Sequence, residues 1–289
     1  MERPDAWVEA LCRTEGLDPG NLVRYPGGST PVYAAGDRVL KLYPPTHLEE
    51  HAAETAVLTA VPDRLPVLVP RLQVSGRWDA WGFVVMDRLD GARLKDVWPA
   101  VRAEARLGLA ARIGELAAAL HAVPLPTLRE DGPAFVAAQR ASAVARHRSW
   151  GLGVEWLTGL SAFLDGVALP AEPAVLLHSD LLPANLLVRP GEGERWSICG
   201  VFDFEQARRG QREYDFVAPA VFLAEGDPTR VHTMLRAYGY AASELDHAFG
   251  RRLLAWLLLH RHGNLAAFLR RLPRPRERTF EALAERWFG

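Results

Sequence analysis

Two segments decide the fold of this chain: residues 176–188, LLHSDLLPANLLV, and residues 198–205, ICGVFDFE. In each segment, an apolar run typical of a buried strand leads into a short polar stretch. The first polar stretch carries Asp180 and Asn185, and the second begins at Asp203. The pattern predicts that two carboxylates and an amide lie on loops at the ends of neighbouring strands.

This set of side chains suits phosphoryl transfer from a nucleotide. The reaction needs a carboxylate that orients the attacking hydroxyl and oxygen ligands for Mg²⁺ on the phosphates. Mg²⁺ binds a few protein oxygens and completes its octahedron with phosphates and water. We therefore expect Asp180 to orient the acceptor, and Asn185 and Asp203 to bind Mg²⁺. The plainer interpretation of Asp180 is a loop aspartate that bonds its own backbone.

The composition narrows the class of protein. The chain has 289 residues, 49% of them hydrophobic, which suits one large domain or two lobes. Its net charge of −1 gives no basic excess for nucleic acid. Two cysteines are too few for a disulfide framework, and no signal or membrane-spanning pattern is visible. We expect a soluble, cytoplasmic, monomeric protein with no nucleic-acid or membrane partner.

The first hundred residues predict a small antiparallel sheet with two helices. Proline and glycine pairs separate short apolar runs, and Gly36-Asp37 is typical of a hairpin turn. Thr46 and Glu49 form the pattern of a capping box at the start of the second helix. The expected helices span residues 5–16 and 46–60, and the expected strands lie within residues 22–43, 67–74 and 81–86.

Beyond Pro99 the periodicity is mostly helical, interrupted by a strand-rich island at 175–204. The expected helices span residues 99–122, 132–149, 154–166, 213–224, 228–238, 243–270 and 276–287. The prediction is an α+β fold of two lobes. Residues 1–88 form a nucleotide-binding lobe, residues 89–289 form a helical lobe with the catalytic loop and the substrate pocket, and residues 87–91 form the hinge.

The motifs together resemble the aminoglycoside phosphotransferase family, which has a protein-kinase-like fold. The resemblance rests on His178-x-Asp180-x4-Asn185 and on Asp203-Phe204. Four further stretches are similar to family segments: residues 39–42, 54–58, 113–122 and 210–216. Ser179 and Leu182 depart from the glycine and histidine that many members have there. The resemblance covers roughly residues 22–270, and residues 202–227 and 257–264 are most similar to hygromycin-B phosphotransferases.

The resemblance implies a nucleotide site in the first lobe. Lys41 would contact the phosphates, and alternation along its strand points it away from Leu40 and Leu42. Glu54 is favoured as its ion partner over Glu50, one turn earlier on the same helix. The alternative interpretation is that Lys41 is exposed on its strand and that Glu54 lies on a solvated face of its helix.

A glycine loop and a strand end complete the expected nucleotide site. Gly28 and Ser29 would cover the phosphates, because glycine lets the backbone approach and serine donates a hydrogen bond. An ordinary Pro-Gly-Gly turn is an equally good interpretation of this segment. Met86, at the end of the strand before the hinge, completes the set.

Four further residues are expected to have supporting roles. His178 is interpreted as bracing the loop through its backbone rather than as a base. Asp215 is expected to start a helix and to accept hydrogen bonds from the catalytic loop. His260 and His262 are placed on a helix as packing or substrate-edge residues, because metal pairs on helices prefer i,i+4 spacing.

Three acids are candidates for binding the acceptor: Glu205, Glu225 and Asp227. Residues 201–227 contain six acids against three arginines, which would suit a polycationic aminosugar. A solvated surface is the plainer interpretation of Glu225 and Asp227. By resemblance, the chain transfers the γ-phosphoryl group of ATP or GTP to an aminoglycoside such as hygromycin B and gives resistance. The alternatives are a kinase of a macrolide, choline, homoserine or methylthioribose, and a nucleotide-binding regulator without turnover.

Overall fold

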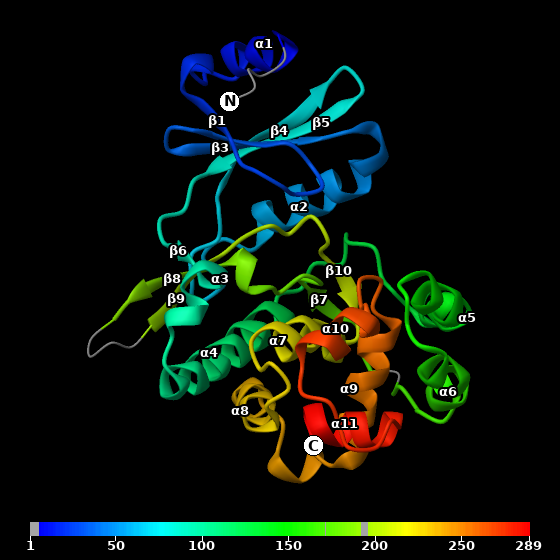
Figure 1. Ribbon diagram of the computed structural model, residues 1–289. Helices are drawn as coiled ribbons and strands as arrows, with labels where there is room; N and C mark the ends of the chain where they lie inside the picture. Colours follow the sequence, from blue (N-terminus) through cyan, green and yellow to red (C-terminus); the bar gives the residue numbers. More distant parts are fainter. Residues whose placement is uncertain (1–5, 171, 192–195) are drawn as a thin grey trace.

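The computed structural model describes residues 6–170, 172–191 and 196–289. It has the predicted α+β architecture, with a small sheet lobe above a larger helical lobe (Figure 1). The first expected helix includes residue 5, which lies outside the described residues.

A five-stranded antiparallel sheet in the order β1-β2-β3-β5-β4 forms the first lobe. The helix α1 lies on one side of it and α2 on the other (Figure 1). The elements of this lobe are α1 (Ala6–Thr14), β1 (Leu22–Arg24), β2 (Val32–Ala35), β3 (Arg38–Tyr43), α2 (Leu48–Ala60), β4 (Leu72–Trp78) and β5 (Trp81–Asp87).

Alternation along β3 sorts its side chains between the two faces of the sheet. Leu40 and Leu42 pack in a cluster with Leu11 of α1. Tyr43 packs in the main core with Val57 of α2. Lys41, paired with Val32 on one side and Val84 on the other, points away from Leu40 and Leu42, as predicted, and contacts Glu54 of α2.

The second lobe is mainly helical and contains two short sheets, β10-β7 and β6-β8-β9. Two of its helices approach closely at Gly114, because a Cβ there would lie 2.0 Å from the carbonyl oxygen of Met234. The elements are β6 (Ala92–Arg93), α3 (Leu94–Val97), α4 (Ala103–His121), α5 (Pro133–Ser149), α6 (Val154–Asp165), β7 (Val175–Leu177), β8 (Leu186–Pro190), β9 (Trp196–Val201), β10 (Arg208–Gly210), α7 (Val217–Phe222), α8 (Pro228–Tyr238), α9 (His247–Leu259), α10 (Leu265–Arg271) and α11 (Phe280–Phe288).

Two predictions in the first lobe are wrong in detail. The helix α2 begins at Leu48 without a capping box, because Pro45–His47 form a 3₁₀ turn and the Thr46 hydroxyl contacts His47 Nδ1 at 3.0 Å. The strand expected from residue 67 begins at Leu72, since Pro70 cannot donate to a ladder. Leu68 instead bridges to Gly200 of the second lobe.

The helix expected over 243–270 is two helices. The helix α9 ends at Leu259, and α10 starts after Asn264, whose side chain caps it by accepting from Ala267 N at 3.0 Å. A Cβ on Gly263 would lie 1.8 Å from the carbonyl oxygen of Leu257, so a tight turn there requires glycine. His260 and His262 consequently lie in the turn and not on a helix.

The predicted lobe boundary falls in the segment that joins β5 to β6, between Asp87 and Ala92. Among the described residues, no helix combines the length and apolar character needed to cross a membrane.

Candidate active site

Asp180 and Asn185 lie on the loop between β7 and β8. Asn185 ends a 3₁₀ turn that starts at Pro183. Its amide nitrogen donates to the carbonyl oxygen of Asp180 at 2.9 Å and approaches the Asp180 carboxylate at 3.4 Å. Burial, together with the charge of Asp203, raises the pKa of Asp180 despite the opposing effect of His178. The loop therefore presents one carboxylate with a fixed amide beside it.

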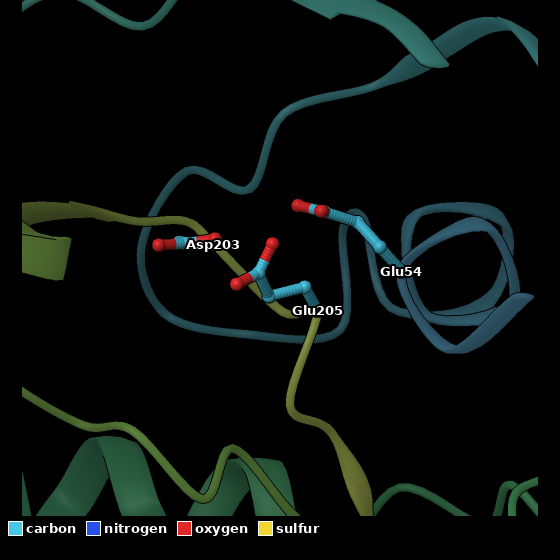
Figure 2. A group of neighbouring side chains, drawn as sticks. All are labelled: Glu54, Asp203 and Glu205. Carbon is cyan, nitrogen blue, oxygen red and sulfur yellow. The ribbon is translucent and has the colours of Figure 1, made fainter. Parts of the chain in front are cut away.

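Lys41 lies among three carboxylates contributed by both lobes. Its ammonium group is 2.7 Å from Glu54 Oε2, 2.5 Å from Asp203 Oδ1 and 3.0 Å from Glu205 Oε2. Figure 2 shows Glu54 reaching from α2 toward Asp203 and Glu205 on the segment after β9. Of the two glutamates considered as partners of Lys41, Glu54 makes the contact.

The charges of this cluster stabilise one another. Burial alone lowers the pKa of Lys41, but Glu54, helped by Tyr43 and the other two carboxylates, outweighs burial and raises it well above its usual range. Burial raises the pKa of Asp203. The neighbouring Lys41 more than reverses this effect, so the pKa of Asp203 lies below its usual value. Lys41 and Asp203 therefore each favour the charged form of the other, whereas burial raises the pKa of Glu54.

Sequence reasoning missed two further contacts of Glu54. The Tyr43 hydroxyl donates to Glu54 Oε2, and the backbone N–H of Phe204 donates to Glu54 Oε1 at 3.3 Å. Tyr43 follows Lys41 by two residues on β3, so strand alternation places both on the same face. This spacing was the signal available in the sequence.

The residues predicted to bind Mg²⁺ have suitable oxygen atoms. Because the Asn185 nitrogen donates to Asp180, its oxygen is the atom left to accept a cation. Asp203 uses Oδ1 for Lys41, and its side chain is 34% exposed. One oxygen each from Glu54, Asp203 and Glu205 lie within 4.8 Å of one another, but Lys41 already bonds all three residues. The donor set fits a hard cation at Asn185 and Asp203.

The glycine loop between β1 and β2 has the conformation that glycine permits. Gly27 has φ +79° and Gly28 has φ +92°, values that other residues rarely adopt. The Ser29 hydroxyl that follows donates to Glu205 Oε1 at 2.7 Å. The loop therefore lies above the same cluster that holds Lys41.

As predicted, Asp215 accepts hydrogen bonds from the start of the loop between β7 and β8. Its buried carboxylate accepts from the backbone N–H groups of His178 at 2.8 Å and Ser179 at 2.6 Å. It lies within a 3₁₀ turn, Arg212–Phe216, rather than at the start of a helix. The His178 ring also braces the loop, because its Nε2 contacts the carbonyl oxygen of Phe202 at 3.1 Å.

His121 is a supporting residue that sequence reasoning did not single out. Its Nε2 contacts Asp215 Oδ2 at 3.1 Å, and its Nδ1 contacts the Tyr238 hydroxyl at 3.0 Å. The histidine ends α4, where a helical position gave no sign of a buried polar contact.

Two of the predicted acceptor-binding acids have partners of their own in the second lobe. Glu225 pairs with Arg106 near the start of α4, at 3.0 Å, while His121 at the other end of α4 contacts Asp215. These two positions are about 20 Å apart along the helix at 1.5 Å per residue. Asp227 caps α8 by accepting from Thr229 N at 3.0 Å. Glu225 and Asp227 therefore make structural contacts, and their role in binding the acceptor stays a prediction.

Glu205 contacts the first lobe, and Met86 lies in the hydrophobic core. Glu205 contacts the nucleotide-side residues Ser29 and Lys41, and its side chain is only 10% exposed. Met86 is buried in the main hydrophobic core. A cavity of about 480 Å³ adjoins Glu205, between α2 and residues 127–129, 205–208 and 261.

Comparisons with known proteins agree with this fold. The family model described as "Phosphotransferase enzyme family" matches residues 22–257. No curated protein sequence matches the chain significantly. Similar solved structures include the streptomycin–ATP ternary complex of aminoglycoside phosphotransferase APH(2'')-IIa, with TM-score 0.66, 15% identity and 100% of both chains covered.

Two more solved structures extend the comparison. Aminoglycoside-3'-phosphotransferase of type VIII has TM-score 0.58 and 24% identity, with 89% of this chain and 98% of that chain covered. A thermostable variant of aminoglycoside phosphotransferase APH(4)-Ia with ADP and hygromycin B has TM-score 0.60 and 16% identity. The match covers 97% of this chain and 98% of that chain. The fold is therefore the kinase-like fold of aminoglycoside phosphotransferases, and the chain belongs to the phosphotransferase enzyme family.

Proposed function

We propose that this protein transfers the γ-phosphoryl group of ATP or GTP to a hydroxyl group of a small molecule. The observation that carries the proposal is the Lys41 ammonium group, which contacts Glu54 of one lobe and Asp203 of the other. In this assignment Lys41 binds the phosphates, with Gly28, Ser29 and Met86 around the nucleotide. Mg²⁺, when bound to Asn185 and Asp203, neutralises charge on the phosphates.

Asp180 is assigned to the acceptor hydroxyl. A loose transition state gains more from positioning of the nucleophile than from early proton removal. The amide of Asn185 fixes the Asp180 backbone, and Asp215 fixes the two residues before it. A rigid loop of this kind supports a positioning role.

Asp180→Ala tests this assignment. We expect transfer to fall by at least about a thousandfold, while calorimetry shows Mg-ATP binding close to that of the unaltered protein. Asp165→Ala, an exposed position at the end of α6, is the control. Full activity of Asp180→Ala would contradict the catalytic assignment.

An aminoglycoside is the first acceptor class to assay. Solved structures with this fold include complexes with streptomycin, gentamicin and hygromycin B. A mass-spectrometric screen with Mg²⁺ and both nucleotides would detect a phosphoryl mass gain on aminoglycosides, a macrolide, choline, homoserine and methylthioribose. A gain on an aminoglycoside supports resistance as the function, and a gain on another acceptor keeps the reaction but changes its substrate.

An acidic acceptor is a second candidate, favoured by Arg261 in the wall of the 480 Å³ cavity. Three glutamates and three arginines line the cavity: Glu49, Glu50, Glu205, Arg129, Arg208 and Arg261. Arg129 pairs with Glu49 at 3.2 Å, and Arg208 pairs with Asp131 at 3.0 Å. Within the described residues, Arg261 has no carboxylate at ion-pair distance, and its one side-chain hydrogen bond goes to Gln206 at 3.4 Å. Burial, with Arg208 nearby, lowers the pKa of Arg261. In the same screen, hydroxylated acids test this candidate directly.

A further inference from the structure

Glu205 engages three donors that face the predicted phosphate site. Its Oε1 accepts from the Ser29 hydroxyl at 2.7 Å. Its Oε2 lies 3.0 Å from the Lys41 ammonium and 3.5 Å from the Thr30 hydroxyl. Thr30 and Lys41 are buried, so these contacts are shielded from water.

These donors are the kinds of group that hold phosphate. A hydroxyl group on a glycine loop and a lysine ammonium group bind phosphate oxygens and carboxylate oxygens alike. All three donors belong to the first lobe, whereas Glu205 belongs to the segment after β9 of the second lobe. The carboxylate therefore joins the glycine loop to the second lobe.

The negative charges of this cluster disfavour the binding of nucleotide phosphates. Three carboxylates, from Glu54, Asp203 and Glu205, surround the single ammonium group of Lys41. Glu54 is also held by Tyr43 and Phe204 N, and Asp203 is a proposed metal ligand. Glu205 is thus the carboxylate whose departure frees phosphate-binding donors.

We propose that Glu205 is an internal phosphate surrogate, which the nucleotide phosphates displace from Ser29, Thr30 and Lys41. The inference rests on the proposed nucleotide-binding function. In the exchange, the phosphate oxygens take over the hydrogen bonds of the carboxylate, and Glu205 turns toward solvent. No covalent bond changes.

Displacement of Glu205 also affects the neighbouring cavity. Residues 205–208 line that cavity, and Gln206 contacts Arg208 at 3.2 Å and Arg261 at 3.4 Å. Release of Glu205 loosens this segment.

Glu205→Gln tests the proposal, because the amide keeps the size of the side chain and removes its charge. Binding of ATP and ADP to the full chain is measured by calorimetry, once with EDTA and once with Mg²⁺. We expect the variant to bind metal-free ATP about tenfold more tightly, since an ionic contact no longer competes. Glu50→Gln, which removes a charge from the same side of α2 without touching Lys41, is expected to leave the affinity unchanged.

Hydrogen exchange provides a second readout that a merely structural role would not change. Metal-free ATP is expected to speed amide exchange at residues 205–208 of the unaltered protein. In Glu205→Gln these amides exchange faster before ATP is added. Glu205→Asp, whose shorter side chain loses reach to Ser29, should behave in the same way.

The outcomes separate the two proposals. Equal affinity of both proteins for metal-free ATP, or slower exchange with ATP, would overturn the surrogate role and leave the proposed function standing. Weaker binding of the variant only when Mg²⁺ is present would identify Glu205 as a metal ligand and overturn it too. Absence of nucleotide binding in the unaltered protein would defeat both.

Discussion

At the scale of single residues, buried charges are tolerated here because each has a partner. Lys41 is 5% exposed in its side chain and contacts three carboxylates, and Asp215 is fully buried with three donors. An unpaired buried charge costs far more than such a pair gains. The contacts that offset the cost of burying these charges also fix the positions of Asp203 and of the loop between β7 and β8.

Asp215→Ala tests the support of the catalytic loop. Removal of the carboxylate leaves the N–H groups of His178 and Ser179 buried without an acceptor. At 1–3 kcal/mol for each unsatisfied group, we expect the free energy of unfolding to fall by about 3 kcal/mol. Urea unfolding measures this loss, and the phosphoryl-transfer rate should fall with it.

Asp215→Asn provides the comparison for this change. It keeps one acceptor oxygen, so its stability should lie between those of the unaltered protein and the alanine variant. If Asp215→Ala unfolded at the same urea concentration as the unaltered protein, the bracing role would be refuted.

At the scale of elements, helix ends explain two acids that the sequence associated with substrate. Asp227 has the geometry of an N-cap on α8, and Glu225 has φ +56° in the turn before it. Arg230 on the first turn of α8 approaches both carboxylates, each at 3.3 Å. The acids of this turn therefore serve the join between α7 and α8.

Asp227→Ala distinguishes the two interpretations of this residue. Loss of an N-cap costs about 1 kcal/mol of unfolding free energy, and the KM for the acceptor should not change. Thermal or urea unfolding and steady-state kinetics measure the two quantities. A raised KM with unchanged stability would support the substrate role instead.

At the scale of the whole molecule, stability depends on histidines that fold in the neutral state. His260 is buried, its Nε2 contacts the carbonyl oxygen of Ser179 at 3.4 Å, and its ring stacks on Tyr214. Burial, helped by His262, lowers the pKa of His260 to about 3. In the unfolded chain, histidine has a pKa of about 6.5.

His260→Gln tests the resulting pH dependence. Between about pH 6.5 and pH 3, the unfolded chain binds a proton at His260 that the folded protein does not bind. The unfolding free energy of the unaltered protein should therefore fall as pH falls, by up to about 1.4 kcal/mol per pH unit from this residue. Urea unfolding at pH 7, 6 and 5 should show a shallower fall in the variant. Parallel pH profiles for the two proteins would contradict the assignment.

The local features of this protein could be predicted from short sequence patterns. Apolar runs that end in polar loops located Asp180, Asn185 and Asp203, because the strand pattern and the polar break are adjacent in the chain. Alternation on β3 gave the direction of Lys41. The two-lobed order of sheet and helices also followed from periodicity, since each element is encoded within its own residues.

Which charged side chains meet depends on how distant elements pack, and local patterns could not predict it. Periodicity placed Glu50 and Glu54 on one helical face, but packing of α2 on the sheet buried Glu54 and brought it to Lys41. A count of acids after β9 could not separate Glu205, which lies against Lys41, from Glu225, which lies against Arg106. The partners of these acids are distant in the chain, and composition near a motif carries no information about which distant cation folds against it.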